Sequence, residues 1–138
     1  MIVVARLSKV NGKKITDENN NVLGDIDVFC IVPEQRKIIV GEVKDFSFAK
    51  NPYEMNQEYK RIFVDDKKPC YMTKHKKRTD WIKKHMEDVK IHFGLKGEKW
   101  VVKPAMFVSE EIISNAFYHK NIKIIVYSNI TEEAVKNI

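Results

Sequence analysis

Two apolar runs joined by a short polar connection constrain the fold of this chain more than any other feature. Residues 24–32 and 37–45 are each rich in Val and Ile, and the four residues at 33–36, Pro-Glu-Gln-Arg, separate them. Strand-forming runs on either side of a short turn predict a β-hairpin. Counting outward from a loop at 33–36 places Asp27 directly opposite Glu42 in this hairpin.

A helix is predicted next, at 52–63. Asn51 is a plausible N-cap, Pro52 suits the first helical position, and Glu54 stands where a capping-box acid belongs. Apolar residues at helical spacing predict one buried face: Met55, Tyr59, Ile62 and Phe63.

The rest of the chain adds strands and helices around the hairpin. Strands are predicted at 3–10, at 100–108 and at 122–127, and a turn is predicted at residues 11–14, Asn-Gly-Lys-Lys. Pro104 predicts an edge or a break within the strand at 100–108. Helices are predicted after a basic loop, with Thr79 as the cap, and at 110–118.

The order of strands, helices and strands predicts an α/β fold, a mixed central sheet flanked by helices. The length of 138 residues suits a single domain over residues 1–138. Cys30 and Cys70 are too few for a disulfide framework or a four-ligand zinc site. Without a secretion signal or an apolar run long enough to span a membrane, the sequence predicts a cytoplasmic protein with no membrane partner.

Positive charge is concentrated in one segment of the chain. The formal net charge is +6, and residues 67–84 hold eight Lys and Arg residues but one acid, Asp80. The candidate phosphate contacts are Lys74, Lys76, Lys77 and Arg78. If the helix begins early, the spacing of three places His75, Arg78 and Trp81 on one helix side. The alternative is an ordinary solvated surface.

The hairpin carries the candidate chemistry. Strand side chains alternate, so Glu42 and Lys44 share a face, and Asp27 opposite Glu42 shares it too. Two adjacent carboxylates repel unless a cation lies between them, and Mg²⁺, with Mn²⁺ as a substitute, prefers such oxygen ligands. The Val43 carbonyl is a further candidate ligand. Lys44 would orient an attacking water or offset charge on a phosphate.

At these residues the sequence resembles the PD-(D/E)XK nuclease superfamily. The family pairs an acid on one hairpin strand with Asp or Glu, any residue and Lys on the next, and Asp27, Glu42 and Lys44 match it. The resemblance covers about residues 24–63. It implies a restriction-endonuclease-like fold and Mg²⁺-dependent hydrolysis of DNA phosphodiester bonds by an endonuclease. Gly24-Asp25-Ile26-Asp27 is similar to both Holliday-junction resolvase-like and nuclease-related (NERD-like) members.

The sequence departs from the family pattern at one place. Many members carry a further acid on a helix before the first core strand, and this sequence has no room for that helix before residue 3. Glu54, Gln57 and Glu58 are candidate substitutes, and Asp25 is a possible accessory acid at the end of its strand. The alternatives to an active nuclease are an inactive nucleic-acid-binding module of the same fold and a basic protein-interaction domain. A homodimer or a larger assembly is compatible with the sequence.

Overall fold

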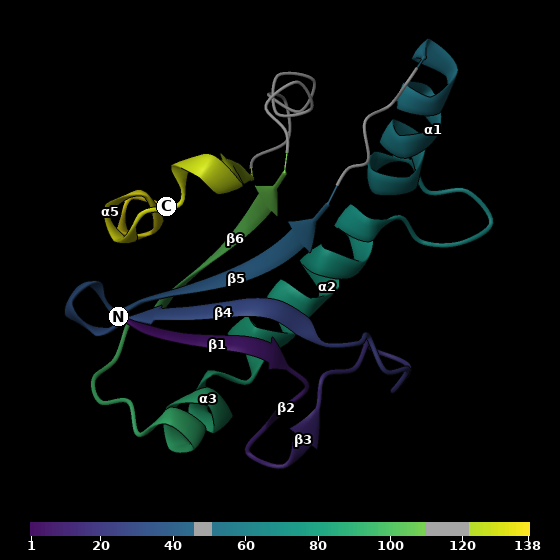
Figure 1. Cartoon of the computed structure of the whole chain (residues 1–138). Coiled ribbons are helices and arrows are strands. Elements are labelled where there is room, and N and C mark those ends of the chain that lie inside the picture. The colour runs from purple at the N-terminus through teal and green to yellow at the C-terminus, as the bar shows by residue number, and fades with distance from the viewer. Residues whose placement is uncertain (46–50, 110–121) are drawn as a thin grey trace.

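A mixed β-sheet forms the centre of the computed structural model, which describes residues 1–45, 51–109 and 122–138 (Figure 1). The strands lie in the order β1-β4-β5-β6-β7. Their bounds are Ile2–Leu7, Ile26–Val32, Lys37–Lys44, Val101–Val108 and Lys123–Val126. The pairs β1–β4 and β4–β5 are antiparallel, whereas the pairs β5–β6 and β6–β7 are parallel. The predicted α/β class with a mixed sheet is confirmed.

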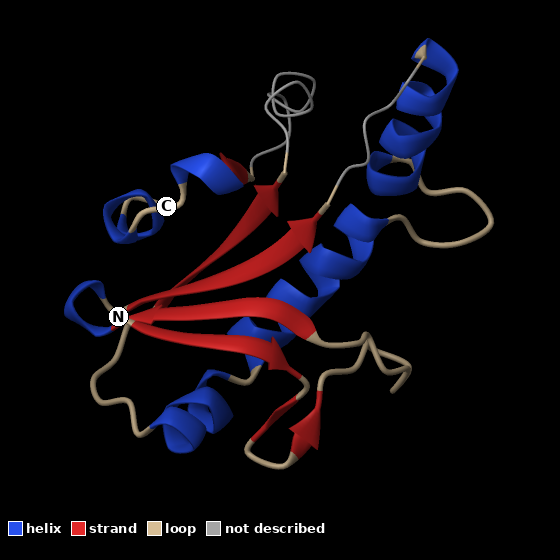
Figure 2. Cartoon of the chain, in the orientation of Figure 1, coloured by secondary structure: helices blue, strands red, loops and turns tan. Residues whose placement is uncertain are grey.

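Helices lie on both faces of this sheet (Figure 2). Their bounds are Pro52–Phe63 for α1, Tyr71–Lys84 for α2, Met86–Phe93 for α3 and Glu132–Lys136 for α5, with 3₁₀ turns at Pro33–Gln35 and Tyr127–Asn129. On one face, Ile82 of α2 and Val89 of α3 are buried in a cluster with Phe29 of β4. On the other face, Val135 of α5 joins a cluster with Ile39 of β5. The sheet therefore separates two apolar layers, and α2 lies on the same face as the even-numbered residues of β5.

The predicted hairpin is confirmed as β4 and β5. The pairing runs from Val32 with Lys37 to Val28 with Gly41, which is the register that a loop at 33–36 dictates. Pro33–Gln35 forms a 3₁₀ turn, and Arg36 closes it with a left-handed backbone. The predicted pair of Asp27 with Glu42, one step further, is not among the recorded pairs.

The N-terminus of α1 also follows the sequence. The Asn51 side chain accepts a hydrogen bond from the Glu54 nitrogen, at 3.0 Å, and Pro52 is the first helical residue. The predicted buried face is only partly right, because Met55 and Tyr59 are exposed while Ile62 and Phe63 are buried. α1 therefore contacts the core mainly through its last turn.

The prediction for α2 was wrong in its start. The helix begins at Tyr71, so the lysines at 74–77 are helical, and Thr79 lies in the helix interior, where its hydroxyl donates to the His75 carbonyl. Asp65 stabilises the new start by accepting from the Cys70 nitrogen, at 2.8 Å. Lys and Arg are good helix formers, so a run of them is no evidence for a loop. The lysine-rich sequence was therefore interpreted as a loop, although it belongs to a helix whose buried side is partly polar.

The later strands agree with the sequence, except at Pro104. β6 lies between β5 and β7, so the strand as a whole is neither an edge strand nor broken. However, β7 pairs with β6 only from Ala105 onward, so Pro104 has a strand neighbour on one side only, β5. Its missing N–H therefore removes no ladder bond. The helix predicted at 110–118 lies outside the described residues.

The first strand prediction, 3–10, is divided in the structure. β1 ends at Leu7, and β2, Lys9–Val10, forms a small hairpin with β3, Lys13–Lys14. Of the turn predicted at residues 11–14, Asn11 and Gly12 join the two strands, and both have positive φ, as a type I′ hairpin turn requires. Lys13 and Lys14 belong to β3 instead.

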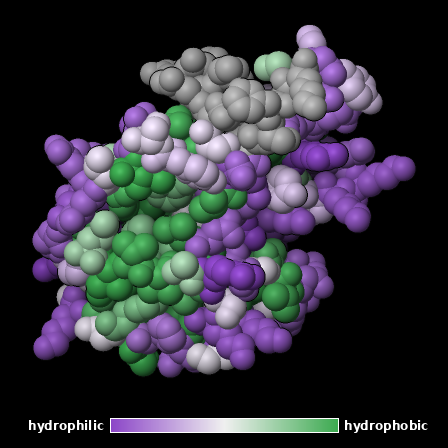
Figure 3. Space-filling model, in the orientation of Figure 1, coloured by the Kyte–Doolittle hydropathy of each residue, from purple (hydrophilic) through white to green (hydrophobic). Residues whose placement is uncertain are grey.

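The visible surface is mixed in character. Hydrophobic side chains gather over β1 and β4 in the view of Figure 3, and hydrophilic side chains project around the edges. Among the helices of the described residues, none combines the length and the apolar character needed to cross a membrane.

Candidate active site

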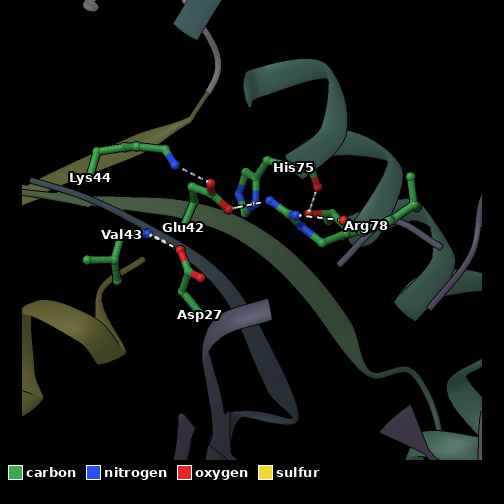
Figure 4. A network of polar contacts seen from close by, with 8 residues as sticks. Asp27, Glu42, Val43, Lys44, His75 and Arg78 are labelled. Carbon is green, nitrogen blue, oxygen red and sulfur yellow. Dashed lines mark hydrogen bonds and ion pairs between the residues drawn. The ribbon is translucent and has the colours of Figure 1, made fainter. Parts of the chain in front are cut away.

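Glu42 is the centre of a buried network of charges on the face of β5 that α2 covers (Figure 4). The residue is only 3 % exposed. One carboxylate oxygen, Oε1, lies 2.7 Å from Lys44 Nζ. The predicted common face of Glu42 and Lys44 is therefore present, because strand residues two apart point the same way.

Arg78 of α2 holds the other carboxylate oxygen. Its Nη2 donates to Glu42 Oε2, and its Nη1 donates to the Leu23 carbonyl at 3.0 Å. Gly24, with φ +82°, lies next to that carbonyl, a backbone conformation that glycine adopts without strain. Arg78 thus ties α2 to both the segment before β4 and the middle of β5. The guanidinium is buried and engaged, which differs from its predicted place on a phosphate-binding surface.

His75 completes the network without a hydrogen bond. Its side chain is 1 % exposed, and Nδ1 lies 3.9 Å from Glu42 Oε2. Among the described residues, neither ring nitrogen has a hydrogen-bond partner. Burial, followed by the positive charges of Arg78 and Lys44, lowers the pKa of His75 to about 4. His75 is therefore neutral at pH 7, and the charge on Glu42 is balanced by Lys44 and Arg78.

Asp27 is not brought to Glu42 by any recorded contact, because the recorded β4–β5 pairs end at Val28 with Gly41. Its Oδ2 accepts a hydrogen bond from the Val43 backbone nitrogen, at 2.8 Å. Figure 4 shows the Glu42 carboxylate turned toward α2, while the Asp27 carboxylate reaches the backbone of β5. Each carboxylate therefore has its own partners, two cations for Glu42 and an N–H donor for Asp27.

Lys44 is the most accessible member of the network. Its side chain is 19 % exposed, against 8 % for Arg78, and its Nζ lies 3.8 Å from the centre of the Tyr71 ring. An ammonium over an aromatic face is attracted to the ring. Lys44 therefore has a second favourable contact that does not involve Glu42, whereas Arg78 is fixed by two buried acceptors.

The carboxylate oxygens of Asp27 and Glu42 are ligands of the kind that a hard divalent cation prefers, but binding at Glu42 would break one of its existing ion pairs. No hydrogen bond to Asp27 Oδ1 is found within the described residues, which leaves one carboxylate oxygen available. Both Glu42 oxygens already contact cationic side chains, so a metal ion at Glu42 must displace one of them. Lys44 is the one that has an alternative contact, the Tyr71 ring. No group of three or more His, Cys, Asp or Glu side chains suited to a metal occurs in the part of the chain that the structure describes.

The remaining predicted residues are not part of this network. Asp25 is half-buried just before β4, and Glu54, Gln57 and Glu58 lie on α1. Within residues 1–45, 51–109 and 122–138, no recorded hydrogen bond or ion pair joins Asp25, Gln57 or Glu58 to Glu42. Their accessory roles remain predictions.

The three predicted lysines of α2, Lys74, Lys76 and Lys77, are exposed. Lys74 lines a hollow between α1 and α2. Lys77 lines a separate hollow beside the loop at 16–20. The role of these lysines in nucleic-acid binding stays a prediction.

Two partners of Glu42 were not assigned to it from the sequence. The spacing of His75, Arg78 and Trp81 indicated a shared helix side, and all three are buried on α2. That spacing was the available signal, because a polar residue on an otherwise buried helix face needs a polar partner. Tyr71 gave no such signal, since its ring position depends on where α2 begins.

Comparisons of the chain with protein-family models, curated proteins and solved structures give no match. The assignment of a function therefore depends on the residues and geometry described above.

Proposed function

We propose that this chain is a Mg²⁺-dependent nuclease domain of the restriction-endonuclease-like, PD-(D/E)XK type, acting on DNA phosphodiester bonds. The observation that carries the proposal is the β4–β5 hairpin, which brings the Asp27 carboxylate to the nitrogen of Val43, the residue between Glu42 and Lys44, while Lys44 contacts Glu42. The mixed sheet, with an antiparallel β4–β5 hairpin and a parallel β6 beside β5, is compatible with that fold.

The chain's own residues have distinct roles in this proposal. Asp27 and Glu42, with the Val43 carbonyl, would hold the cation, and Arg78 holds the Glu42 carboxylate in its orientation from the side of α2. Bound Mg²⁺ would activate a water and neutralise charge on the phosphate. Lys44, once released from Glu42, presents an ammonium that orients the water or stabilises the charge developing on the phosphate oxygens.

The test is cleavage of labelled DNA in linear, nicked, branched and single-stranded forms, with Mg²⁺ or Mn²⁺ against EDTA. Lys44→Met should reduce the cleavage rate by roughly 100-fold or more, since a removed charge-stabilising group costs about that much. Lys103→Met removes the same charge from an exposed position on β6 and should leave the rate unchanged. Equal rates for the two variants would contradict the role of Lys44.

The second candidate is an inactive nucleic-acid-binding module of the same fold. The occupation of both Glu42 oxygens by Lys44 and Arg78 favours it, because a carboxylate saturated by protein cations is a poor metal ligand. A clean preparation that binds DNA yet cuts none of the four forms with either metal would replace the nuclease proposal by this one. Failure to bind DNA even at low salt would favour a protein-interaction domain instead.

A further inference from the structure

A basic groove lies between α1 and α2, away from the buried charges of the candidate active site. It has a volume of about 670 Å³. Its basic lining residues are Lys60, Arg61, Lys67, Lys68 and Lys74, and its acids are Asp65 and Asp66. The groove includes residues of the connection between α1 and α2 (Figure 1). In Figure 3, which has the same orientation, hydrophilic side chains project at that edge of the molecule.

The acids reduce the positive charge of this groove only in part. Asp65 is turned toward the start of α2, where it accepts from the Cys70 nitrogen at 2.8 Å and from the Thr73 hydroxyl at 2.9 Å. Its carboxylate is thus engaged by neutral donors of the helix start. Five basic side chains against two acids leave a net positive lining.

The other hollow on α2 is a useful comparison. It has about 490 Å³ and lies beside the loop at 16–20. Its basic residues, Lys77, Lys83 and Lys84, are matched by the acids Asp17, Glu18 and Asp80. A balanced lining gives no net attraction for a polyanion. The groove between α1 and α2 is therefore the better of the two for phosphates.

Tyr71 connects this groove to the candidate active site. The residue lines the groove, is 41 % exposed, and has Lys44 Nζ 3.8 Å from its ring centre. Sites for single-stranded nucleic acid combine a positive groove with aromatic rings on which bases stack. A hollow of this volume suits a few nucleotides of one strand.

We propose that the groove between α1 and α2 binds the phosphate backbone of a single DNA strand, with Tyr71 as a stacking contact, and directs that strand toward Lys44. The direction toward Lys44 rests on the proposed nuclease function, whereas binding in the groove does not. The two are separable because binding is measured in EDTA, where no metal-dependent cleavage occurs.

The experiment measures the fluorescence anisotropy of a labelled single-stranded oligonucleotide across a salt titration. The groove variant is Lys60→Gln/Lys67→Gln/Lys68→Gln. Each phosphate contact contributes about 0.7 to the slope of log K against log salt for single strands. Loss of three contacts should lower the slope by about 2 and weaken binding roughly 100-fold at 0.1 M salt.

The matched control is Lys14→Gln/Lys96→Gln/Lys103→Gln, which removes the same charge from exposed positions outside the groove. It should keep the slope and most of the affinity. Tyr71→Leu should weaken binding by about 10-fold, and Tyr71→Phe should retain it, because stacking needs the ring and not the hydroxyl. Circular dichroism confirms that each variant is folded.

Several outcomes would overturn this proposal. They are an absence of single-strand binding by the wild-type chain at low salt, equal losses in the groove and control variants, and equal competition by polyglutamate or by a duplex of the same length. If instead the wild-type chain binds the single strand through the groove but cleaves no DNA with added metal, the groove stands and the nuclease proposal fails.

Discussion

The ion pair between Glu42 and Arg78 should be among the most strongly coupled pairs in this protein. Both residues are buried, at 3 % and 7 % exposed, and they are joined directly through Arg78 Nη2. Removing one member of a buried pair leaves an uncompensated charge, which costs about 3–5 kcal/mol. We therefore expect Glu42→Gln and Arg78→Met each to lower the free energy of unfolding by that amount.

The double variant separates this explanation from simple loss of packing. With both charges gone, only the partly exposed Lys44 ammonium has lost its carboxylate, so Glu42→Gln/Arg78→Met should cost little more than either single change. The coupling free energy from the cycle should then be about 3 kcal/mol. Urea unfolding at pH 7, followed by the fluorescence of buried Trp81, gives all four stabilities.

A surface pair is the matched control for this cycle. Lys13 Nζ lies 2.7 Å from Asp88 Oδ2, but the lysine side chain is 57 % exposed. Exposed pairs couple by less than about 1 kcal/mol. A coupling between Glu42 and Arg78 no larger than that between Lys13 and Asp88 would refute the reasoning. If Arg78→Met fails to fold, Arg78→Lys keeps the charge but loses the two-pronged contact, and a milder loss is expected.

Three further predictions concern stability. In metal-free protein, His75 has a folded pKa of about 4 against an ordinary value of 6.5. Its contribution to the free energy of unfolding should therefore be intact above pH 6.5 and fall by roughly 3 kcal/mol as the pH drops to 4. His75→Phe should remove that part of the pH dependence in urea unfolding. Gly41→Ala should cost about 1–3 kcal/mol in the same assay, because the new Cβ would lie 2.7 Å from the Phe107 ring. Asn51→Ala should cost about 1 kcal/mol by removing the cap of α1, and an unchanged midpoint would contradict that role.

The hairpin could be read from the sequence because its signals are local. A four-residue loop determines the register, and the pairing from Val32 with Lys37 to Val28 with Gly41 follows from it. The start of α1 was equally local, since Asn51, Pro52 and Glu54 lie within four consecutive positions. These features depend on turn and capping chemistry that acts over a few residues.

The start of α2 and the partners of Glu42 depend on contacts between distant segments. Arg78 meets Glu42 across 36 residues and meets the Leu23 carbonyl across 55 residues of sequence. A lysine-rich stretch has no apolar periodicity that would reveal this, because the buried side of α2 is made partly of His75, Arg78 and Thr79. Of these three, Arg78 supplies a counter-charge to Glu42, and that pairing is visible only once β5 and α2 are packed together.

The two cations on Glu42 differ in a way that bears on the chemistry. Arg78 is held by two buried acceptors, so releasing it would leave both the Leu23 carbonyl and a guanidinium without partners, at a cost of several kcal/mol. Lys44 is partly exposed and already lies over the Tyr71 ring, so its release costs far less. An incoming divalent cation would therefore exchange with Lys44 and leave Arg78 in place. That exchange would free the ammonium of Lys44 beside the groove at Tyr71, where a phosphate bound in the groove could meet it.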